Sequence, residues 1–437
     1  MFSSQEFEKR RARCLQQLEA PCLAILVGNS LQVRNGDAEY AFRQHSDFYY
    51  LTGMQEPDMI MLLIKEETTT EYIIFNQAID LKQTIWVGSR IGQENACKIY
   101  GADKAYESKD FDKHFLEILA NKKNIYYSLG IKPEWDNRLM ALLNQARKKY
   151  HKTKTVPNAI QALQPILHEM RLIKSPYEIN VMRIAAQISA KAHLEVMKKC
   201  KVNKVEYELE AEFTYVCTMS GCRALAYTTI VGGGNNACTL HYIDNNQMLQ
   251  EGSLVLIDAG GEFELYAADI TRTIPVNGKF SVPQAALYEL VLKAQMAAIS
   301  IVQPGLPWTL LQEKIVFVLV EGLVALGILK GDIEKLIHEK AYQPFYMHSS
   351  GHWLGLDVHD VGAYQKDNQA RLLEPGMVFT IEPGLYINAN QENVDAKWRG
   401  IGIRIEDDIL VTDTGYEILS KALPKNIKDI ENIMQNA

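Results

Sequence analysis

The sequence predicts two domains of different class: an α/β domain over residues 1–173 and an α+β domain over residues 174–437. Short β-rich runs alternate with helical patterns in the first third of the chain, which is typical of α/β domains. Beyond residue 173, strands and long helical patterns occur in blocks, which favours helices that cover one face of an antiparallel sheet. A chain of 437 residues is also long enough for two or three domains.

The first domain is expected to carry a central sheet. Its apolar, β-rich runs are CLAILVG, MIMLLIK, EYIIFNQ and NIYYSLG, and helical patterns between them cover residues 111–120 and 134–150. After this domain, Ser175, Pro176 and Glu178 form a helix-start signal. The serine can accept backbone N–H groups and the acid lies near the positive helix end. This signal places the domain boundary just before the helix.

The second domain should combine long helices with a mainly antiparallel sheet. Helical patterns cover residues 176–200, 204–220, 283–303 and 308–328. Strand-like runs are LVLIDAG, ITRTIPV, MVFTIEPG and IGIRIEDDILVT, and their hairpin-like spacing favours antiparallel pairing.

Composition and charge exclude several functions. The formal net charge is -7 and no long basic run occurs, so the sequence offers no basic patch for a nucleic acid. The first twenty residues are charged throughout, unlike a secretory signal, and the most apolar stretch, 315–329, is too short to span a bilayer. The seven cysteines are scattered without a CxxC pair, which favours reduced thiols. We therefore expect a cytoplasmic protein with neither a membrane nor a nucleic-acid partner.

Two aspartates in LVLIDAGGEFELYAADITRTIPV are candidates for one metal site. If the strands form a hairpin that turns between Phe263 and Glu264, Asp258 faces Asp269 across the ladder. Cross-strand neighbours have Cβ atoms about 4.5–5.5 Å apart, and two carboxylates at that distance repel unless a proton or a cation neutralises them. The alternative is that both acids lie in exposed turns.

Two further acids lie at the ends of apolar strands. Glu382 follows an inward-facing run in VFTIEPG, and Glu406 lies on the same strand face as Arg404 in GIRIEDDILV. Each acid alone could be a solvated strand end. Four acids in this pattern favour an oxygen-rich site for hard or borderline divalent ions such as Mn²⁺.

Histidines complete the candidate site. The run HSSGHWLGLDVHD contains His348, His352 and His359, and CTLHY contains His241. Glycines within the first run predict an irregular backbone that brings side chains to a common point. One imidazole could ligate a metal while the others donate to the substrate or the transition state. A lone histidine is often only a core or surface residue, and that alternative stays open for each.

The chemistry of such a site is hydrolysis. Two metals bridged by carboxylates can hold a hydroxide at neutral pH, polarise a carbonyl and stabilise a tetrahedral oxyanion. The residues alone therefore predict a two-metal hydrolase. The glycine-rich run VGGGNN lacks the spacing and the following Lys-Ser/Thr of a phosphate loop, and no GxSxG motif occurs.

These motifs resemble those of the pita-bread metallopeptidases. IDAG, ADITRT, HSSGHWLGLDVHD, TIEPG and GIRIEDD hold, in the same order, residues that match the five metal ligands of that family. The resemblance extends through HEMRLIKSPYEI into the first domain, where RNGDAEYAFRQHSDFYYLTG and IWVGSRIGQENA also match. It covers nearly the whole chain and is similar to the bacterial type of aminopeptidase P, which implies a pita-bread fold for the second domain.

The resemblance implies an activity and a role for each ligand. The expected reaction is metal-dependent hydrolysis of Xaa-Pro-Yaa peptides, which releases the residue before proline by means of a hydroxide bridging two divalent metals. Mn²⁺ is the expected ion, with Co²⁺ and Zn²⁺ as alternatives. Asp258 would bind one metal, His352 and Glu382 the other, and Asp269 and Glu406 would bridge both. Glu382 would also accept the proton of the bridging water.

The resemblance also implies residues that serve the substrate. His241, His348 and His359 would line the pocket, with His359 at the scissile carbonyl or its oxyanion. Arg404 would fix a ligand carboxylate.

Two residues of the first domain imply an assembly. Trp86 and Asp37 match residues that reach a neighbouring subunit's active site in tetrameric relatives, so a homo-oligomer, either a tetramer or a dimer, is expected. Ser349, where relatives usually have Gly, and the loop 388–399 depart from the family pattern and put the substrate fit in doubt.

Other enzymes of the same fold are the alternatives. Prolidase, which cleaves Xaa-Pro dipeptides, shares all five ligands, but the match in the first domain favours aminopeptidase P. Methionine aminopeptidase lacks a large N-terminal domain, and creatinase loses the ligands that are intact here. A catalytically dead module that binds protein or peptide would also lack ligands.

Overall fold

The chain folds into two compact units. In the computed structural model, which describes residues 4–436, the first unit extends to Met170 and the second begins at Arg171. Each unit has its own core of buried aliphatic and aromatic side chains. The expected α/β class of the first unit and α+β class of the second are confirmed.

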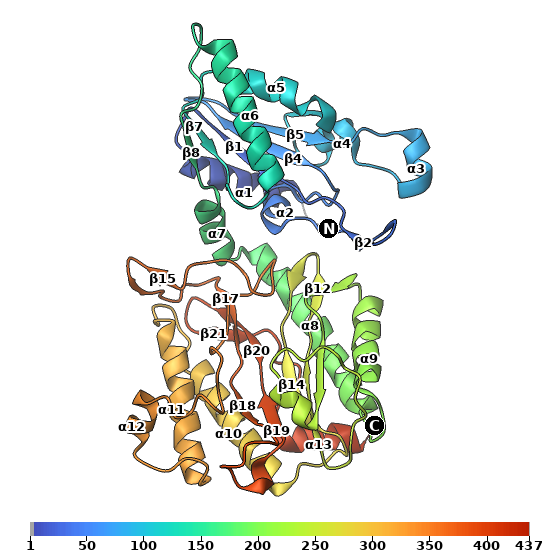
Figure 1. Ribbon diagram of the computed structural model, residues 1–437, viewed down its shortest axis with the longest axis vertical. Coiled ribbons are helices and arrows are strands. Elements are labelled where there is room, and N and C mark those ends of the chain that lie inside the picture. Colours follow the sequence, from blue (N-terminus) through green and yellow to red (C-terminus); the bar gives the residue numbers. More distant parts are fainter. Residues whose placement is uncertain (1–3, 437) are drawn as a thin grey trace. The chain divides into compact units, whose positions relative to one another are not determined.

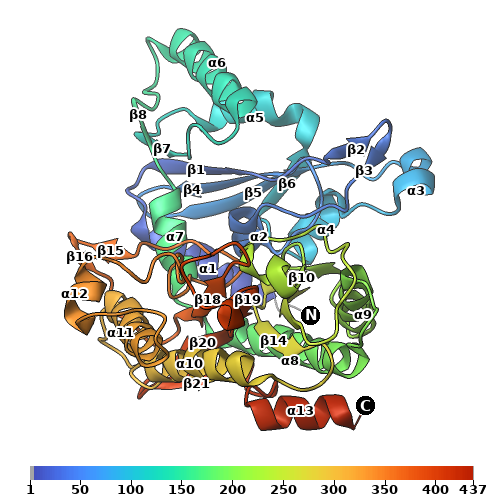
Figure 2. The same cartoon turned by 60° about the horizontal axis from the view of Figure 1, so that its bottom comes forward.

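The first unit is a mixed sheet with helices on both faces (Figures 1 and 2). Its elements are α1 (Ser4–Gln17), β1 (Cys22–Val27), β2 (Val33–Asn35), β3 (Ala38–Glu39), α2 (Ser46–Thr52), β4 (Ile60–Lys65), β5 (Thr70–Asn76), α3 (Leu81–Val87), α4 (Gly92–Lys98), β6 (Lys104–Glu107), α5 (Phe111–Ile118), β7 (Asn124–Tyr126), α6 (Pro133–Tyr150), β8 (Ala159–Gln161) and α7 (Gln164–Leu172). The strand order is β6-β5-β4-β1-β7-β8. Helices α5 and α6 cover one face of this sheet, and α1 and α2 lie on the other (Figure 2).

The second unit is built from antiparallel strands and two pairs of long helices. Its helices are α8 (Pro176–Lys199), α9 (Glu206–Met219), α10 (Val282–Ile299), α11 (Thr309–Ala325), α12 (Ile333–His338) and α13 (Ile427–Gln435). Its strands are β9 (Ala224–Leu225), β10 (Ile230–Gly233), β11 (Leu254–Asp258), β12 (Gly261–Phe263), β13 (Tyr266–Ala267), β14 (Thr271–Pro275), β15 (Gln365–Lys366), β16 (Gln369–Ala370), β17 (Val378–Ile381), β18 (Gly384–Ile387), β19 (Ile401–Arg404), β20 (Asp407–Val411) and β21 (Tyr416–Ile418). Helix α8 packs with α9 and α10 with α11, and the two pairs flank the strands in Figure 1. The long helices predicted from the sequence are therefore confirmed.

Helix α8 begins as the sequence predicts. The side chain of Ser175 accepts the N–H of Glu178 at 3.3 Å, and the Glu178 carboxylate accepts the N–H of Ser175 at 2.9 Å. These two bonds satisfy backbone donors that the first helical turn leaves without partners. The start of the long helix is thus fixed by local sequence.

The hairpin that carries Asp258 and Asp269 has a different register from the predicted one. Asp258 pairs with Thr271 because the chain turns at Glu264 and Leu265. Both turn residues have positive φ angles, 50° and 65°, as a two-residue primed turn requires, and neither is the Gly or Asn that would mark it. The predicted direct pairing of the aspartates is therefore wrong. A shift of two residues still leaves them as diagonal neighbours on one face, since side chains alternate with a period of two.

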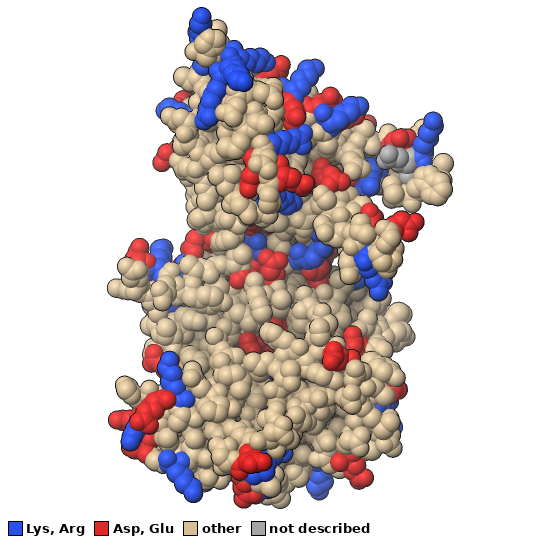
Figure 3. Space-filling model, in the orientation of Figure 1, with Lys and Arg blue, Asp and Glu red and all other residues tan. Residues whose placement is uncertain are grey.

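Three further features concern membrane-spanning helices, cysteines and surface charge. None of the helices described within residues 4–436 is long and apolar enough to cross a membrane. All seven cysteines are free thiols. On the face shown in Figure 3, acidic and basic side chains are interspersed rather than gathered into one continuous basic patch.

Candidate active site

The second unit contains a cavity of about 730 Å³. All of the predicted site residues that belong to this unit line the cavity, namely His241, Asp258, Asp269, His348, His352, His359, Glu382, Arg404 and Glu406. Trp86 and Asp37 belong to the first unit, where both side chains are exposed. The fold therefore gathers in one pocket residues that are far apart in the sequence.

Four acids reach the pocket from the ends of strands. Asp258 is the last residue of β11, and Glu382 directly follows β17. Asp269 lies between β13 and β14, and Glu406 lies between β19 and β20. Every residue of β11 and β17 is buried, so the packed sheet fixes where each acid emerges.

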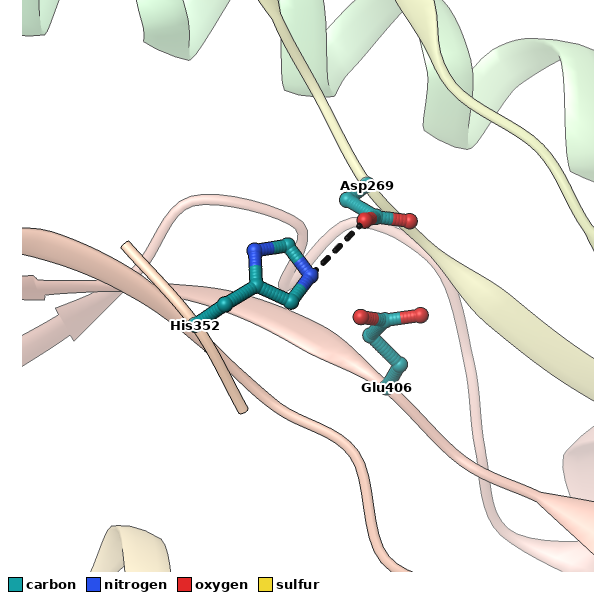
Figure 4. A group of neighbouring side chains, drawn as sticks. All are labelled: Asp269, His352 and Glu406. Carbon is teal, nitrogen blue, oxygen red and sulfur yellow. Dashed lines mark ion pairs between the residues drawn. The ribbon is translucent and has the colours of Figure 1, made fainter. Parts of the chain in front are cut away.

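Asp269, His352 and Glu406 form the centre of the site (Figure 4). One potential ligand atom from each lies within 4.8 Å of the other two. His352 Nε2 is 3.3 Å from Oδ2 of Asp269 and 3.6 Å from Oε1 of Glu382. The other ring nitrogen, Nδ1, lies 3.1 Å from the carbonyl oxygen of Trp353, which leaves Nε2 facing the carboxylates. A metal-ligating histidine is oriented in this way.

Asp258 is held by Arg404 and Tyr227. Arg404 Nη2 donates to Oδ2 of Asp258 at 2.5 Å, and the Tyr227 hydroxyl lies 2.6 Å from Oδ1. The same hydroxyl lies 2.5 Å from Oδ1 of Asp269, so it joins the two aspartates. Burial opposes ionisation of Asp258, but the Arg404 charge and the Tyr227 hydroxyl outweigh it and lower the pKa of this carboxyl. The lowered pKa favours the ionised carboxylate of Asp258, which is the form that binds a cation.

The other three acids crowd one another. Burial and Asp258 raise the pKa of Asp269, burial and Asp269 raise the pKa of Glu406 well above its ordinary value, and burial raises the pKa of Glu382 to about 7. Burial opposes a charge on His352, yet its bond to Asp269 raises the pKa of the ring to about 9. Carboxylates this close ionise together only around positive charge. The donor set therefore fits divalent cations that prefer oxygen and imidazole.

His348 is a polar group of the pocket wall. Its Nε2 lies 2.8 Å from the Tyr386 hydroxyl, and its Nδ1 lies 2.9 Å from the carbonyl oxygen of Ser349. Burial and the Arg404 charge lower the pKa of His348 to about 4. The ring is thus neutral and fixed between two partners.

His359 and His241 are less enclosed. The ring of His359 lies 4.2 Å, centroid to centroid, from that of His352. Burial and the neighbouring His352 lower the pKa of His359, so this ring is neutral too. His241 is exposed and lies beyond β10 and a short 3₁₀ turn. Both side chains can meet a molecule that enters the cavity.

Sequence analysis missed Tyr227, Thr271 and Tyr386. Thr271 Oγ1 donates to Oε2 of Glu406 at 2.7 Å, and Arg404 Nη1 donates to the Tyr386 hydroxyl at 3.0 Å. Thr271 and Tyr386 follow predicted ligands by two and four residues, so the alternation of strand side chains could have found them. Tyr227 has no comparable signal, since nothing in the sequence separates it from the other tyrosines.

Comparison with known proteins agrees with this geometry. Residues 180–413 match the metallopeptidase family M24, and residues 7–126 match the aminopeptidase P N-terminal domain. The Xaa-Pro aminopeptidase of Escherichia coli is 43% identical over 99% of this chain and 98% of its own. The Xaa-Pro aminopeptidase of Haemophilus influenzae is 44% identical over 98% of this chain and 97% of its own.

Solved structures show the same fold. Pseudomonas aeruginosa aminopeptidase PepP has a TM-score of 0.98 and 45% identity, and the match covers 100% of this chain and 98% of that chain. A zinc-substituted Escherichia coli aminopeptidase P in complex with product has a TM-score of 0.97 and 42% identity, with 100% and 99% covered. The second unit thus has the pita-bread fold. The chain belongs to metallopeptidase family M24, in its bacterial aminopeptidase P branch.

Proposed function

We propose that the protein is an Xaa-Pro aminopeptidase that uses two divalent cations. It removes the N-terminal residue of Xaa-Pro-Yaa peptides by hydrolysing the bond before proline. The observation that carries this proposal is the convergence of four carboxylates and His352 in one pocket. The relatives from Escherichia coli and Haemophilus influenzae, which match over nearly the whole chain, are named for the same activity.

Five residues hold the cations in this proposal. Asp258 would hold one, His352 and Glu382 would hold the other, and Asp269 and Glu406 would serve both. When bound, the two cations supply a hydroxide at neutral pH and polarise the scissile carbonyl. The oxygen-rich donor set supports Mn²⁺ as the natural ion, because thiolate-preferring ions find no cysteine among the residues that line the pocket.

Arg404 orients the side chains that are proposed to bind the metals. Its guanidinium donates to Asp258, to the hydroxyl of Thr271 at 3.2 Å and to that of Tyr386 at 3.0 Å. Thr271 in turn donates to Glu406. The buried guanidinium of Arg404 thus connects Asp258, a proposed ligand of one metal, with Glu406, a proposed ligand of both. This connection supports an orienting role for Arg404.

Glu382 is the proposed proton acceptor. Thr380 Oγ1 lies 3.3 Å from Oε1 of Glu382, while His348 Nδ1 lies 3.8 Å from Oε2. The Thr380 hydroxyl orients the carboxylate at the pocket wall, where Oε1 lies 3.6 Å from Nε2 of His352. From there it takes the proton of the attacking water and passes it to the leaving proline nitrogen.

The remaining histidines serve the peptide. His359 donates a hydrogen bond to the carbonyl oxygen as that atom gains negative charge, an interaction that is stronger in the transition state than in the ground state. His348 and His241 position the peptide from the wall of the cavity. Ile230, Leu240 and Ile243 give the same cavity an apolar side, which suits a proline ring or an apolar N-terminal residue.

The first unit supports a proposed assembly. Trp86 is 87% exposed on α3, and Leu81 and Ile85 of the same helix are 80% and 82% exposed. Asp37 is exposed between the two short strands β2 and β3. We expect this apolar surface to be covered in a homo-oligomer, in which Trp86 and Asp37 complete the pocket of a neighbouring subunit. A cytoplasmic location stays a prediction.

Peptide assays on the Mn²⁺-loaded protein test the proposed activity. Proline has no amide N–H and fixes φ at about −65°, so a pocket shaped for it needs no acceptor at that position. We expect rapid cleavage of Xaa-Pro-Yaa tripeptides and slow cleavage of Xaa-Ala-Yaa controls with the same flanking residues. Equal kcat/KM on the two would indicate a general aminopeptidase. Faster cleavage of Xaa-Pro dipeptides than of tripeptides would indicate a prolidase.

A further inference from the structure

Asp360, the residue after His359, is a buried carboxylate between two buried cations. Arg171 Nη2 donates to its Oδ1 at 2.5 Å, and Lys174 Nζ donates to its Oδ2 at 3.0 Å. The side chains of Asp360, Arg171 and Lys174 are 1%, 3% and 1% exposed. Burial favours the neutral acid, but the two cations outweigh it and lower the pKa of Asp360. We call these three residues the Asp360 anchor.

The anchor lies behind the loop that carries two histidines of the pocket. The rings of His352 and His359 meet inside the cavity, while Asp360 does not line it. The N–H of Asp360 donates to the carbonyl oxygen of Trp353 at 2.8 Å, which closes the loop. A Cβ at Gly355 would lie 2.1 Å from Oδ2 of Asp360. The loop is therefore packed directly against the anchored carboxylate.

The two basic residues of the anchor, Arg171 and Lys174, belong to the segment at the start of the second unit. Arg171 lies in the last turn of α7, whose final two residues belong to the second unit, and Lys174 lies just before α8. The N–H of Lys174 donates to the carbonyl oxygen of Gly376 at 2.9 Å, two residues before β17 begins. The Asp360 anchor thus connects the histidine loop to the strand whose end bears a predicted ligand.

We propose that Asp360 is a positioning residue that sets the orientation of the His359 imidazole toward the scissile carbonyl. This inference rests on the function proposed above, in which His359 stabilises the oxyanion. Asp360 acts through the chain, since its carboxylate faces Arg171 and Lys174 while the adjacent His359 faces the cavity. A misplacement of about 1 Å at a catalytic group can cost ~10²-fold in rate, so the position of this loop matters for turnover.

A double-mutant cycle tests the proposal. Asp360→Asn keeps the shape of the side chain and removes its charge. We expect kcat on Xaa-Pro-Yaa to fall by ~10²-fold while both metal ions stay bound. In a His359→Ala background the same substitution should cost little, because the group that it positions is gone. An equal loss in both backgrounds would overturn the proposal. An unchanged kcat for His359→Ala alone would instead remove the oxyanion role from the proposed function, and the proposal with it.

Two further variants complete the experiment. Gly355→Ala keeps every charge and displaces the Asp360 carboxylate, so kcat should fall while metal content stays at two ions per chain. If Asp360→Asn loses metal or unfolds, Gly355→Ala alone tests the proposal. Asp357→Asn is the matched control: its carboxylate lies 2.7 Å from the same Arg171 Nη2 but is 38% exposed. Water can replace the interactions that the exposed Asp357 carboxylate loses, and Arg171 keeps its bond to Asp360, so kcat should change by less than ~5-fold. A loss as large as that of Asp360→Asn would overturn the proposal.

Discussion

The acids and the histidines of the pocket are held in different ways. Asp258 and Glu406 are 8% and 1% exposed and adjoin strands whose residues are buried. His241, His348 and His359 lie on irregular segments and are more exposed as a group. Like charges repel, so a cluster of carboxylates needs a rigid frame to keep its geometry. Groups that meet a substrate lie on loops that such a frame positions.

The acids and the histidines also differ in the side chains that they contact. Glu406 accepts from Thr271, and Asp258 accepts from Arg404, so both acids have neighbours within the sheet. The ring of His359 instead contacts the ring of His352, and the residue lies on an irregular loop. Removing a strand-borne acid should therefore affect the metal ions, whereas removing a histidine that holds no metal, such as His359, should affect turnover.

Glu406→Ala should give the largest loss. It removes one of the two proposed bridging carboxylates, so fewer than two cations per chain should remain by metal analysis. Turnover should fall by more than the ~10²–10³ that one lost oxyanion donor costs. Glu406→Gln is the matched control, because it keeps the shape and an oxygen for Thr271 but loses the charge. Two ions per chain with normal turnover in Glu406→Ala would remove this residue from the ligand set.

His359→Ala should give the next largest loss. Removing one oxyanion donor costs ~10²–10³ in kcat, and kcat and kcat/KM should fall by similar factors with both metals retained. His352→Ala should instead lose metal. The reverse result would exchange the roles of His352 and His359. A rise in KM alone would make His359 a ground-state binding residue.

Tyr227→Phe should have an intermediate effect. Its hydroxyl joins Asp258 and Asp269, and such outer partners typically change metal affinity by ~10–100-fold. Metal titration followed by activity should show this weakening, with turnover partly restored at high Mn²⁺. Tyr242→Phe is a matched control, since its hydroxyl donates at 2.8 Å to Glu206 away from the cavity lining. An unchanged affinity in Tyr227→Phe would show that the sheet alone fixes the aspartates.

Trp86→Ala should have the smallest effect. The side chain is 87% exposed, so the folding free energy should change by no more than about 0.5 kcal/mol and both metals should stay bound. If Trp86 completes a neighbouring pocket, KM for longer peptides should rise severalfold. Leu129→Ala, at a position 50% exposed outside α3, is the control. A strictly monomeric wild-type protein with full activity on those peptides would contradict the proposed assembly.

Much of the acidic side of the pocket could be predicted because its signals are local. A carboxylate at the end of an apolar strand, as at Asp258 and Glu382, is visible in a few residues of sequence. Pairing register was not predictable, because Glu264 and Leu265 form the hairpin turn without the residues that usually mark one. The roles of the individual ligands came from resemblance to a family and not from spacing.

By itself the sequence determined the two fold classes, the start of α8 at Ser175 and the inventory of acids and histidines, since periodicity and capping act over neighbouring residues. Only the tertiary structure decided that Tyr227 joins two aspartates and that Arg171 reaches Asp360, which lies 189 positions away in the chain. Such contacts depend on how packed strands and helices bring distant segments together. No local pattern encodes them, because each partner alone has the sequence context of an ordinary polar residue.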